Sequence, residues 1–331
     1  MKIRSLKVIQ KIIGTDKASL IANIRNHYKL SGNPEQLKAR TSCAFELLIS
    51  EWLAIVWQVD LYDQTQEGKK LHVKWLGKRL KLSSSGNGTA DSMGFFNGYQ
   101  IVVEFTLETS AHQVSKEFSQ STRHYDQLVD NRTINKDNSF LILISPEIHQ
   151  DTFKHFKADN YRCILLNQDH LRAITDKIVR MAEYHIPTSH FRLKELLITT
   201  ARLLERSTRI SEYNSAFEDA VNKWYEENLR DAYLEMIAVN SYSFLKDAYN
   251  SNRKLVGASE ILKALTTINK LQQFVKEVSK SISADDISSA VTRYHIAKVT
   301  ELSYEYEPFF TPFNYLDIKF SYVSFLNEIA E

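Results

Sequence analysis

The sequence has few of the residues that mark several large classes of protein. It contains two cysteines, Cys43 and Cys163, far apart and in no CxxC pair, so neither a disulfide framework nor a structural zinc site is predicted. Nine glycines and five prolines among 331 residues argue against collagen-like, linker-rich or many-turned all-β chains. No apolar run approaches the roughly 20 residues that span a bilayer. The basic start, Met1–Ile13, lacks the continuous apolar core of a secretory signal. We therefore expect a reduced, cytoplasmic protein without a membrane partner.

Charge of one sign is also scarce, because the formal net charge is +2. This value excludes a histone-like polycation, so any nucleic-acid surface has to be local. The chain also lacks the GxGxxG, GxxxxGK[ST], HExxH and GxSxG motifs. Their absence argues against a dinucleotide enzyme, a P-loop NTPase, a zincin and an α/β-hydrolase. The 43% hydrophobic and 25% charged residues are ordinary for a chain that buries a core.

The first 190 residues alternate between helical and strand patterns. A helical pattern near Lys17–Tyr28 precedes a long helix, Pro34–Trp57, which opens with a proline, as first helical turns often do. Asn97-Gly98 is a strong hairpin signal between two short strands, Ser92–Phe96 and Tyr99–Leu107. The elements expected after the hairpin are a helix at Ala111–Val129, a strand at Ser139–Ser145, a helix at Pro146–Phe156, a strand at Tyr161–Asn167 and a helix at Gln168–Glu183.

This order predicts an α/β fold, with a central mixed sheet flanked by helices and a mainly α-helical domain after it. The character changes at Ile186-Pro187-Thr188, and the pattern from Phe191 to about Leu302 is helical. The last stretch, Tyr304–Phe325, is rich in Tyr and Phe and is expected to form a strand-and-loop cap. We predict a lead-in at 1–33, a first domain at 34–187 and a C-terminal domain at 188–331.

Acidic residues in apolar surroundings are the most informative feature of the first domain. Glu104 lies inside the apolar strand IVVEFTL, and a buried carboxylate is costly unless it is paired or binds a metal. The hairpin brings Asp91 beside Glu104, and Glu117 on the next helix can face the same point. Glu46 lies among apolar neighbours on the long first helix. Oxygen-rich clusters of this kind suit Mg²⁺.

The order of these acids resembles that of a known group of enzymes. An acid in one strand, followed by an acid-x-Lys-like triplet in the next strand of a hairpin, is the pattern of the PD-(D/E)xK nuclease superfamily. The stretch 34–183 is similar to the cleavage domain of type IIS restriction endonucleases of the FokI kind. Its local motif is nearer to the AlwI and nicking-endonuclease branch, in which Thr replaces Lys and a further Glu on the next helix joins the site. Glu104-Phe105-Thr106 and Glu117 match that variant.

The resemblance implies phosphodiester hydrolysis with Mg²⁺, for which Mn²⁺ is expected to substitute. It implies metal ligands at Asp91, Glu104, the Phe105 carbonyl and Glu46, with Glu117 and Thr106 as further catalytic residues. The Pro of the motif's name is absent, since Asp91 stands between Ala90 and Ser92.

Thr106 also lacks the positive charge of the usual Lys. Either Lys116 or His124 is available to supply that charge. Gln113 is a candidate for a contact with water or with the phosphate of bound DNA.

Basic residues gather just upstream of the acids. The stretch 69–81 holds six Lys or Arg in 13 residues and no acid, which suits the phosphate contacts that supply most non-specific DNA affinity. The predicted DNA contacts in this basic strip are Lys69, Lys70, Lys74, Lys78, Arg79 and Lys81.

Several of these residues also have plainer interpretations. Asp91 alone would fit a turn cap, and the basic strip alone would fit a solvated strand. Glu108 is a rival of Glu104 in the same strand, and Glu51 is a rival of Glu46. Two histidines, His112 and His124, are expected at the surface.

A cleavage domain of this kind needs a part of the molecule that reads DNA sequence. Ser283–Phe325 is compatible with a winged helix that would place Arg293 and Lys298 in the major groove. The same half also fits a helical scaffold that packs on the nuclease domain, or a dimer surface. We therefore expect a metal-dependent endonuclease acting on double-stranded DNA, as a type II restriction endonuclease of the type IIS-like kind or as one subunit of one. A second nuclease subunit or a homodimer is a possible partner. The rivals are a repair, transposon or phage-defence nuclease of the same fold, and a non-catalytic DNA-binding or assembly subunit.

Overall fold

The computed structural model describes residues 3–56, 60–62, 74–76, 79–81, 91–96, 99–158, 162–184, 186, 191–250 and 286. In 60–62, 74–76, 79–81, 92–96 and 236–250 the backbone alone is described. Two compact units divide the chain: residues 1–182 with 191–224, and residues 183–190 with 225–331. The predicted acids all lie in the first unit. The predicted cap at Tyr304–Phe325 lies outside the described residues.

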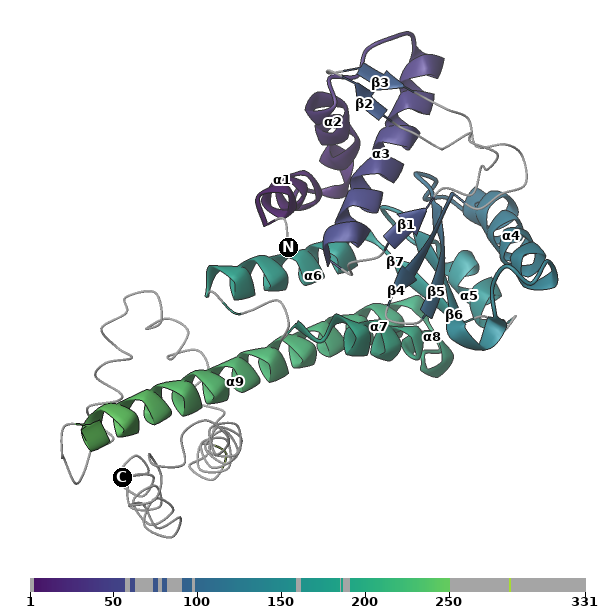
Figure 1. The fold of residues 1–331 in the computed structure, drawn as a ribbon. Helices are drawn as coiled ribbons and strands as arrows, with labels where there is room; N and C mark the ends of the chain where they lie inside the picture. The colour runs from purple at the N-terminus through teal and green to yellow at the C-terminus, as the bar shows by residue number, and fades with distance from the viewer. Residues whose placement is uncertain are drawn as a thin grey trace. The chain divides into compact units, whose positions relative to one another are not determined.

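A mixed five-stranded sheet forms the centre of the first unit (Figure 1). Its strands are β1 (Asp60–Tyr62), β4 (Ser92–Phe96), β5 (Tyr99–Phe105), β6 (Ser139–Ile144) and β7 (Cys163–Leu166), in the order β1-β4-β5-β6-β7. The strands β1, β4 and β5 pair antiparallel, whereas β5, β6 and β7 pair parallel. The predicted mixed sheet and its hairpin are therefore confirmed.

The parallel strands are buried on both faces, which explains their continuous apolar sequences. Every residue of β6 (SFLILI) and of β7 (CILL) is buried. The outer edge of β7 is closed by Tyr213, whose hydroxyl accepts from the Leu165 amide at 3.1 Å and donates to the Leu165 carbonyl at 3.0 Å. A side chain from a later helix therefore satisfies backbone groups that an edge strand would otherwise leave unpaired.

Helices cover both faces of the sheet, with α3 and α6 on one side and α4 and α5 on the other (Figure 1). The first layer contains α3 (Pro34–Val56) and α6 (Gln168–Glu183), joined by a 2.7 Å hydrogen bond from the Trp52 indole to Thr175. The second layer contains α4 (Ser119–Asp130) and α5 (Gln150–Ala158).

Residues 3–27 form two helices, α1 (Ile3–Ile13) and α2 (Lys17–His27), where only the second was expected. Leu6, Ile9 and Ile13 are buried. The buried Gln168 amide of α6 donates to the carbonyls of Ile13 at 2.9 Å and Thr15 at 2.8 Å. These contacts make the expected lead-in part of the first unit's core.

The remaining elements agree broadly with the expected pattern. A two-stranded sheet, β2 (Lys74–Leu76) with β3 (Arg79–Lys81), lies in the basic strip. A short 3₁₀ turn, η2 (Lys136–Asn138), precedes β6. Helices α7 (Leu193–Ala201), α8 (Leu203–Arg206) and α9 (Ile210–Asn250) confirm the helical pattern as far as residue 250.

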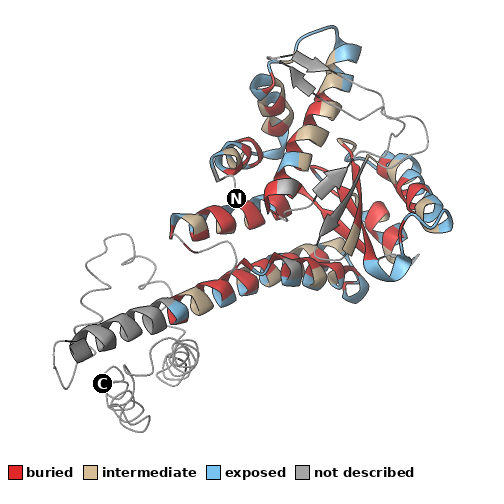
Figure 2. Ribbon diagram, in the orientation of Figure 1, coloured by how far each residue is buried: buried red, intermediate tan, exposed pale blue. Residues whose placement is uncertain are grey.

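Figure 2 shows the buried residues along the central strands and on the helix faces that cover them. Among the described helices, none is both long and apolar enough to cross a membrane.

Candidate active site

The hairpin register places Asp91 beside Glu104. Ser92 pairs with Val103, so the residue before Ser92 lies next to the residue after Val103. One carboxylate oxygen of Asp91 accepts a 2.8 Å hydrogen bond from the Phe105 amide. The Asp91 and Glu104 carboxyl groups also lie close enough for each to shift the pKa of the other, so this is a pair of acids that share a site.

Glu117 reaches the same place through Thr106. The Thr106 hydroxyl, at the end of β5, donates a 2.8 Å hydrogen bond to Glu117 Oε1 and accepts one from the Glu108 amide at 3.0 Å. Thr106 is buried and Glu117 is half-buried. Thr106, which carries no charge itself, therefore orients a neighbouring acid.

Glu46 comes from the middle of α3 and is close enough to interact electrostatically with Asp91 and Glu104. Glu51, the alternative candidate on the same helix, is exposed, and its charge acts on the pKa of Tyr28 instead. The other rival, Glu108, binds Ser110 at 2.6 Å and forms a 3.8 Å ion pair with Lys116. The structure thus gathers Asp91, Glu104, Glu117 and Glu46, which we call the acidic cluster.

Loss of hydration is the main reason why the acidic cluster resists ionisation. It raises the pKa of Glu46 to about 8, with a further contribution from the charge of Asp91. It also raises the pKa of Glu104 to about 8, with contributions from Glu117 and Glu46. The pKa of Asp91 lies well above its usual range and that of Glu117 is raised, both chiefly by the same desolvation. Acids that repel one another in this way favour a bound cation.

His124 contacts the cluster, although the sequence offered it only as one of two alternative sources of positive charge. It was expected at the surface, but it is 1% exposed, and its Nδ1 lies 2.8 Å from Glu104 Oε1. Burial lowers the pKa of His124, and its Nε2 is buried without a hydrogen-bond partner. The available signal was its spacing: His124 follows Glu117 by seven residues, which is two helical turns on one face.

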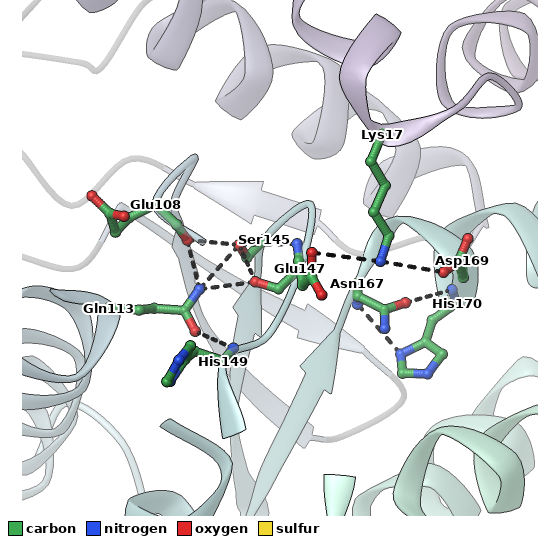
Figure 3. A network of polar contacts seen from close by, with 9 residues as sticks. All are labelled: Lys17, Glu108, Gln113, Ser145, Glu147, His149, Asn167, Asp169 and His170. Carbon is green, nitrogen blue, oxygen red and sulfur yellow. Dashed lines mark hydrogen bonds and ion pairs between the residues drawn. The ribbon is translucent and has the colours of Figure 1, made fainter. Parts of the chain in front are cut away.

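Gln113 was predicted to contact water, phosphate or DNA, and its position argues against that role. The side chain is fully buried, and Figure 3 shows its amide among Glu108, Ser145, Glu147 and His149. Its Nε2 donates to the carbonyls of Glu108 at 2.6 Å and Glu147 at 3.0 Å, and to the Ser145 hydroxyl at 3.1 Å. Its Oε1 accepts from the His149 amide at 2.9 Å. A DNA contact would have to open this network.

Much of the predicted DNA-binding surface falls where the structure gives little or no description. Arg293, Lys298, Lys69, Lys70 and Lys78 lie outside the described residues. The other three residues of the basic strip lie on β2 and β3, where Lys74 is the register partner of Lys81 and Arg79 is that of Leu76.

The chemistry of the acidic cluster fits a hard divalent cation. Carboxylate oxygens and the Phe105 carbonyl are the ligands that Mg²⁺ prefers, and a cation would offset the repulsion that raises the pKa values. Within the part of the chain that the structure describes, no three acidic, His or Cys side chains already stand as a ready metal-binding group. The fit therefore rests on the donor types and on charge.

Together, the mixed α/β fold and the acidic cluster define the class: an α/β protein with an oxygen-rich site beside its central hairpin. Residues 3–174, more than half of the chain, match the AlwI restriction endonuclease family. The chain belongs to that family.

Among solved structures, the chain is similar to the small subunit of the heterodimeric restriction endonuclease R.BspD6I. The two share 15% sequence identity with a TM-score of 0.40, over 61% of this chain and 97% of that one. No curated protein matches the chain.

Proposed function

We propose that this chain is a Mg²⁺-dependent endonuclease that hydrolyses phosphodiester bonds in double-stranded DNA, as a type II restriction endonuclease of the type IIS-like kind or as one of its subunits. The observation that carries the proposal is the acidic cluster around the buried Glu104, in a chain of the AlwI restriction endonuclease family. We further propose that its fold is that of the PD-(D/E)xK nucleases.

The proposed metal ligands are Asp91, Glu104, the Phe105 carbonyl and Glu46. A bound Mg²⁺ supplies Lewis-acid chemistry, which polarises the scissile phosphate and lowers the pKa of a water molecule. The protein's part is to orient these oxygens. The Phe105 amide fixes one oxygen of Asp91, and His124 fixes one oxygen of Glu104.

Glu117 is the proposed proton acceptor. Its Oε1 is held by Thr106, which leaves Oε2 to take a proton from the attacking water. The raised pKa of Glu117 brings this group closer to neutral pH, as a general base requires. Lys116 is 61% exposed beside Glu117, and we propose that it supplies the positive charge that Thr106 lacks.

Recognition of the DNA sequence would then be the role of another part of the assembly. We propose that the basic strip contacts phosphates without sequence preference, and that recognition lies in the C-terminal domain, through Arg293 and Lys298, or in a partner chain.

Cleavage of plasmid DNA by the full chain, in Mg²⁺, Mn²⁺, Ca²⁺ or EDTA, tests the proposal. Mg²⁺ and Mn²⁺ are expected to support cutting. Ca²⁺ is expected to support binding only, because its looser geometry aligns the water poorly. Full activity in EDTA would contradict the mechanism. Cut sites that share no neighbouring sequence would favour a repair, transposon or phage-defence nuclease. Binding without any cutting would favour a non-catalytic subunit.

A further inference from the structure

The segment that carries Glu117 is a π-helical turn, η1 (Val114–Phe118), which runs directly into α4. A π turn contains more residues than an α-helical turn, so it changes the direction in which its side chains point. Such turns are rare and are often found at functional sites. Because an isolated π turn is unfavourable, its surroundings have to hold it.

The end of the turn is held by aromatic packing. The ring of Phe118 lies edge-on against Phe156 of α5, with 4.9 Å between centroids, and 5.3 Å from the ring of His155. Phe118 is 9% exposed and Phe156 is fully buried. This packing fixes the last residue of η1, directly after Glu117, against α5.

The start of the turn is held by Gln113, the residue immediately before it. Its amide joins the loop after β5, through the Glu108 carbonyl, to the β6–α5 loop, through Ser145, Glu147 and His149 (Figure 3). The site needs both a donor and an acceptor. A glutamate would bring its oxygens against two carbonyls. An apolar side chain would remove the acceptor of the His149 amide and leave the two carbonyls to the Ser145 hydroxyl.

From these two anchors we infer that Gln113 is a positioning residue for Glu117. By fixing the start of η1, it holds Glu117 Oε1 at 2.8 Å from Thr106, where the charge of Glu117 acts on Asp91 and Glu104. This inference rests on the proposed function, because Glu117 has a catalytic role only in that reaction. It replaces the DNA contact predicted for Gln113 with an indirect role in the chemical step.

The test compares Gln113→Leu with Gln168→Leu in the full chain. Gln168 is a matched control because it is 2% exposed and donates to two backbone carbonyls, but it lies on α6 and binds the α1–α2 segment. Plasmid cleavage with Mg²⁺ gives kcat, and DNA binding with Ca²⁺ gives Kd. Both are measured at a temperature where melting curves show every variant folded.

We expect Gln113→Leu to lower kcat by about 10- to 100-fold, the range that misplacement of a reacting group produces, without changing Kd. Gln168→Leu is expected to keep the wild-type kcat, since the hydrogen bonds of Gln168 go to the α1–α2 segment and not to η1. In a Glu117→Ala background, Gln113→Leu should have no further effect, because two residues that act through one group are not additive. Ser145→Ala removes one partner of Gln113 and should lower kcat in the same direction. It provides the readout if Gln113→Leu does not fold.

Equal kcat losses in Gln113→Leu and Gln168→Leu would overturn the positioning role. An undiminished effect of Gln113→Leu in the Glu117→Ala background would do the same. If the wild-type chain does not cut DNA with any divalent cation, the proposed function fails and the positioning role fails with it. If the wild type cuts and Gln113→Leu cuts equally well, the positioning role alone fails.

Discussion

At the scale of single residues, Glu104 is the carboxyl group that interacts with all the other acids of the cluster. It interacts electrostatically with Asp91, Glu117 and Glu46, and contacts His124 at 2.8 Å. It is 2% exposed, in a strand in which both of its neighbours, Val103 and Phe105, are buried. An acid in such a position is stabilised only by its partners, which makes these partners the natural targets for mutation.

The raised pKa values predict how the stability of the metal-free protein depends on pH. A carboxyl whose pKa is higher in the folded state than its usual 4.5 stabilises the fold below that value and loses this contribution as pH rises through the folded pKa. For Glu46 and Glu104, with pKa values of about 8, the urea midpoint should fall between about pH 5 and pH 8. Glu104→Gln should flatten this slope, and so should added Mg²⁺. A midpoint that rises over the same interval would contradict the assigned pKa shifts.

Removing His124 should change the Mg²⁺ concentration that cleavage requires. His124→Leu should raise the Mg²⁺ concentration for half-maximal cleavage by about 10- to 100-fold, because residues that orient a ligand have effects of this size. His170→Leu is the control, since His170 is also buried but stacks on Phe217 at 4.0 Å. Cleavage rates over a Mg²⁺ series give the comparison, and equal shifts in both variants would remove the orienting role of His124.

At the scale of elements, the hairpin of β4 and β5 was predictable because Asn97-Gly98 fixes both the turn and the register. The meeting of Asp91 with Glu104 follows from that register alone. The burial of His124 was not predictable in the same way, because the predicted bounds of a helix do not determine which of its faces packs on the sheet.

Two further features of the fold were not predicted from the sequence. The helix α1 was missed because residues 1–33 were interpreted as a lead-in, although Leu6, Ile9 and Ile13 have helical spacing. The hydrogen bonds of Gln113 depend on loops that approach one another only in the folded chain.

The edge of β7 gives a prediction about stability alone. Tyr213→Phe removes the hydroxyl that pairs with both backbone groups of Leu165. Leaving buried polar groups unpaired should lower the free energy of unfolding by about 1–3 kcal/mol. Urea unfolding measures this change, and cleavage at low temperature should stay at the wild-type level. A loss of cleavage without a loss of stability would show that Tyr213 has a catalytic role instead.

At the scale of the whole molecule, the first unit extends beyond the family match at residues 3–174, because residues 191–224 belong to it. Tyr213 and Phe217 lie in that extension and contact β7 and His170. A fragment that ends near Glu183 would therefore lack part of its own core.

DNA binding over a salt series tests which residues make non-specific phosphate contacts and which recognise the base sequence. Substituting Lys74 and Lys78 should weaken binding to all sequences and flatten the salt dependence, because phosphate contacts release counterions. Substituting Arg293 and Lys298 should weaken specific binding more than non-specific binding, because base contacts carry discrimination. If the second pair of substitutions leaves the preference for specific DNA unchanged, another part of the chain or a partner recognises the base sequence.

The central claim is that the acidic cluster performs metal-dependent cleavage of DNA, and the Glu104→Gln variant tests it most directly. Glutamine keeps the shape of the side chain and removes a negative charge that the fold disfavours, so the variant should fold and bind DNA at least as well as the wild type. The measurement is the rate of plasmid cleavage in Mg²⁺ by wild type and variant, at equal DNA occupancy. The account predicts that the rate for Glu104→Gln falls to background, whereas turnover at the wild-type level would contradict it.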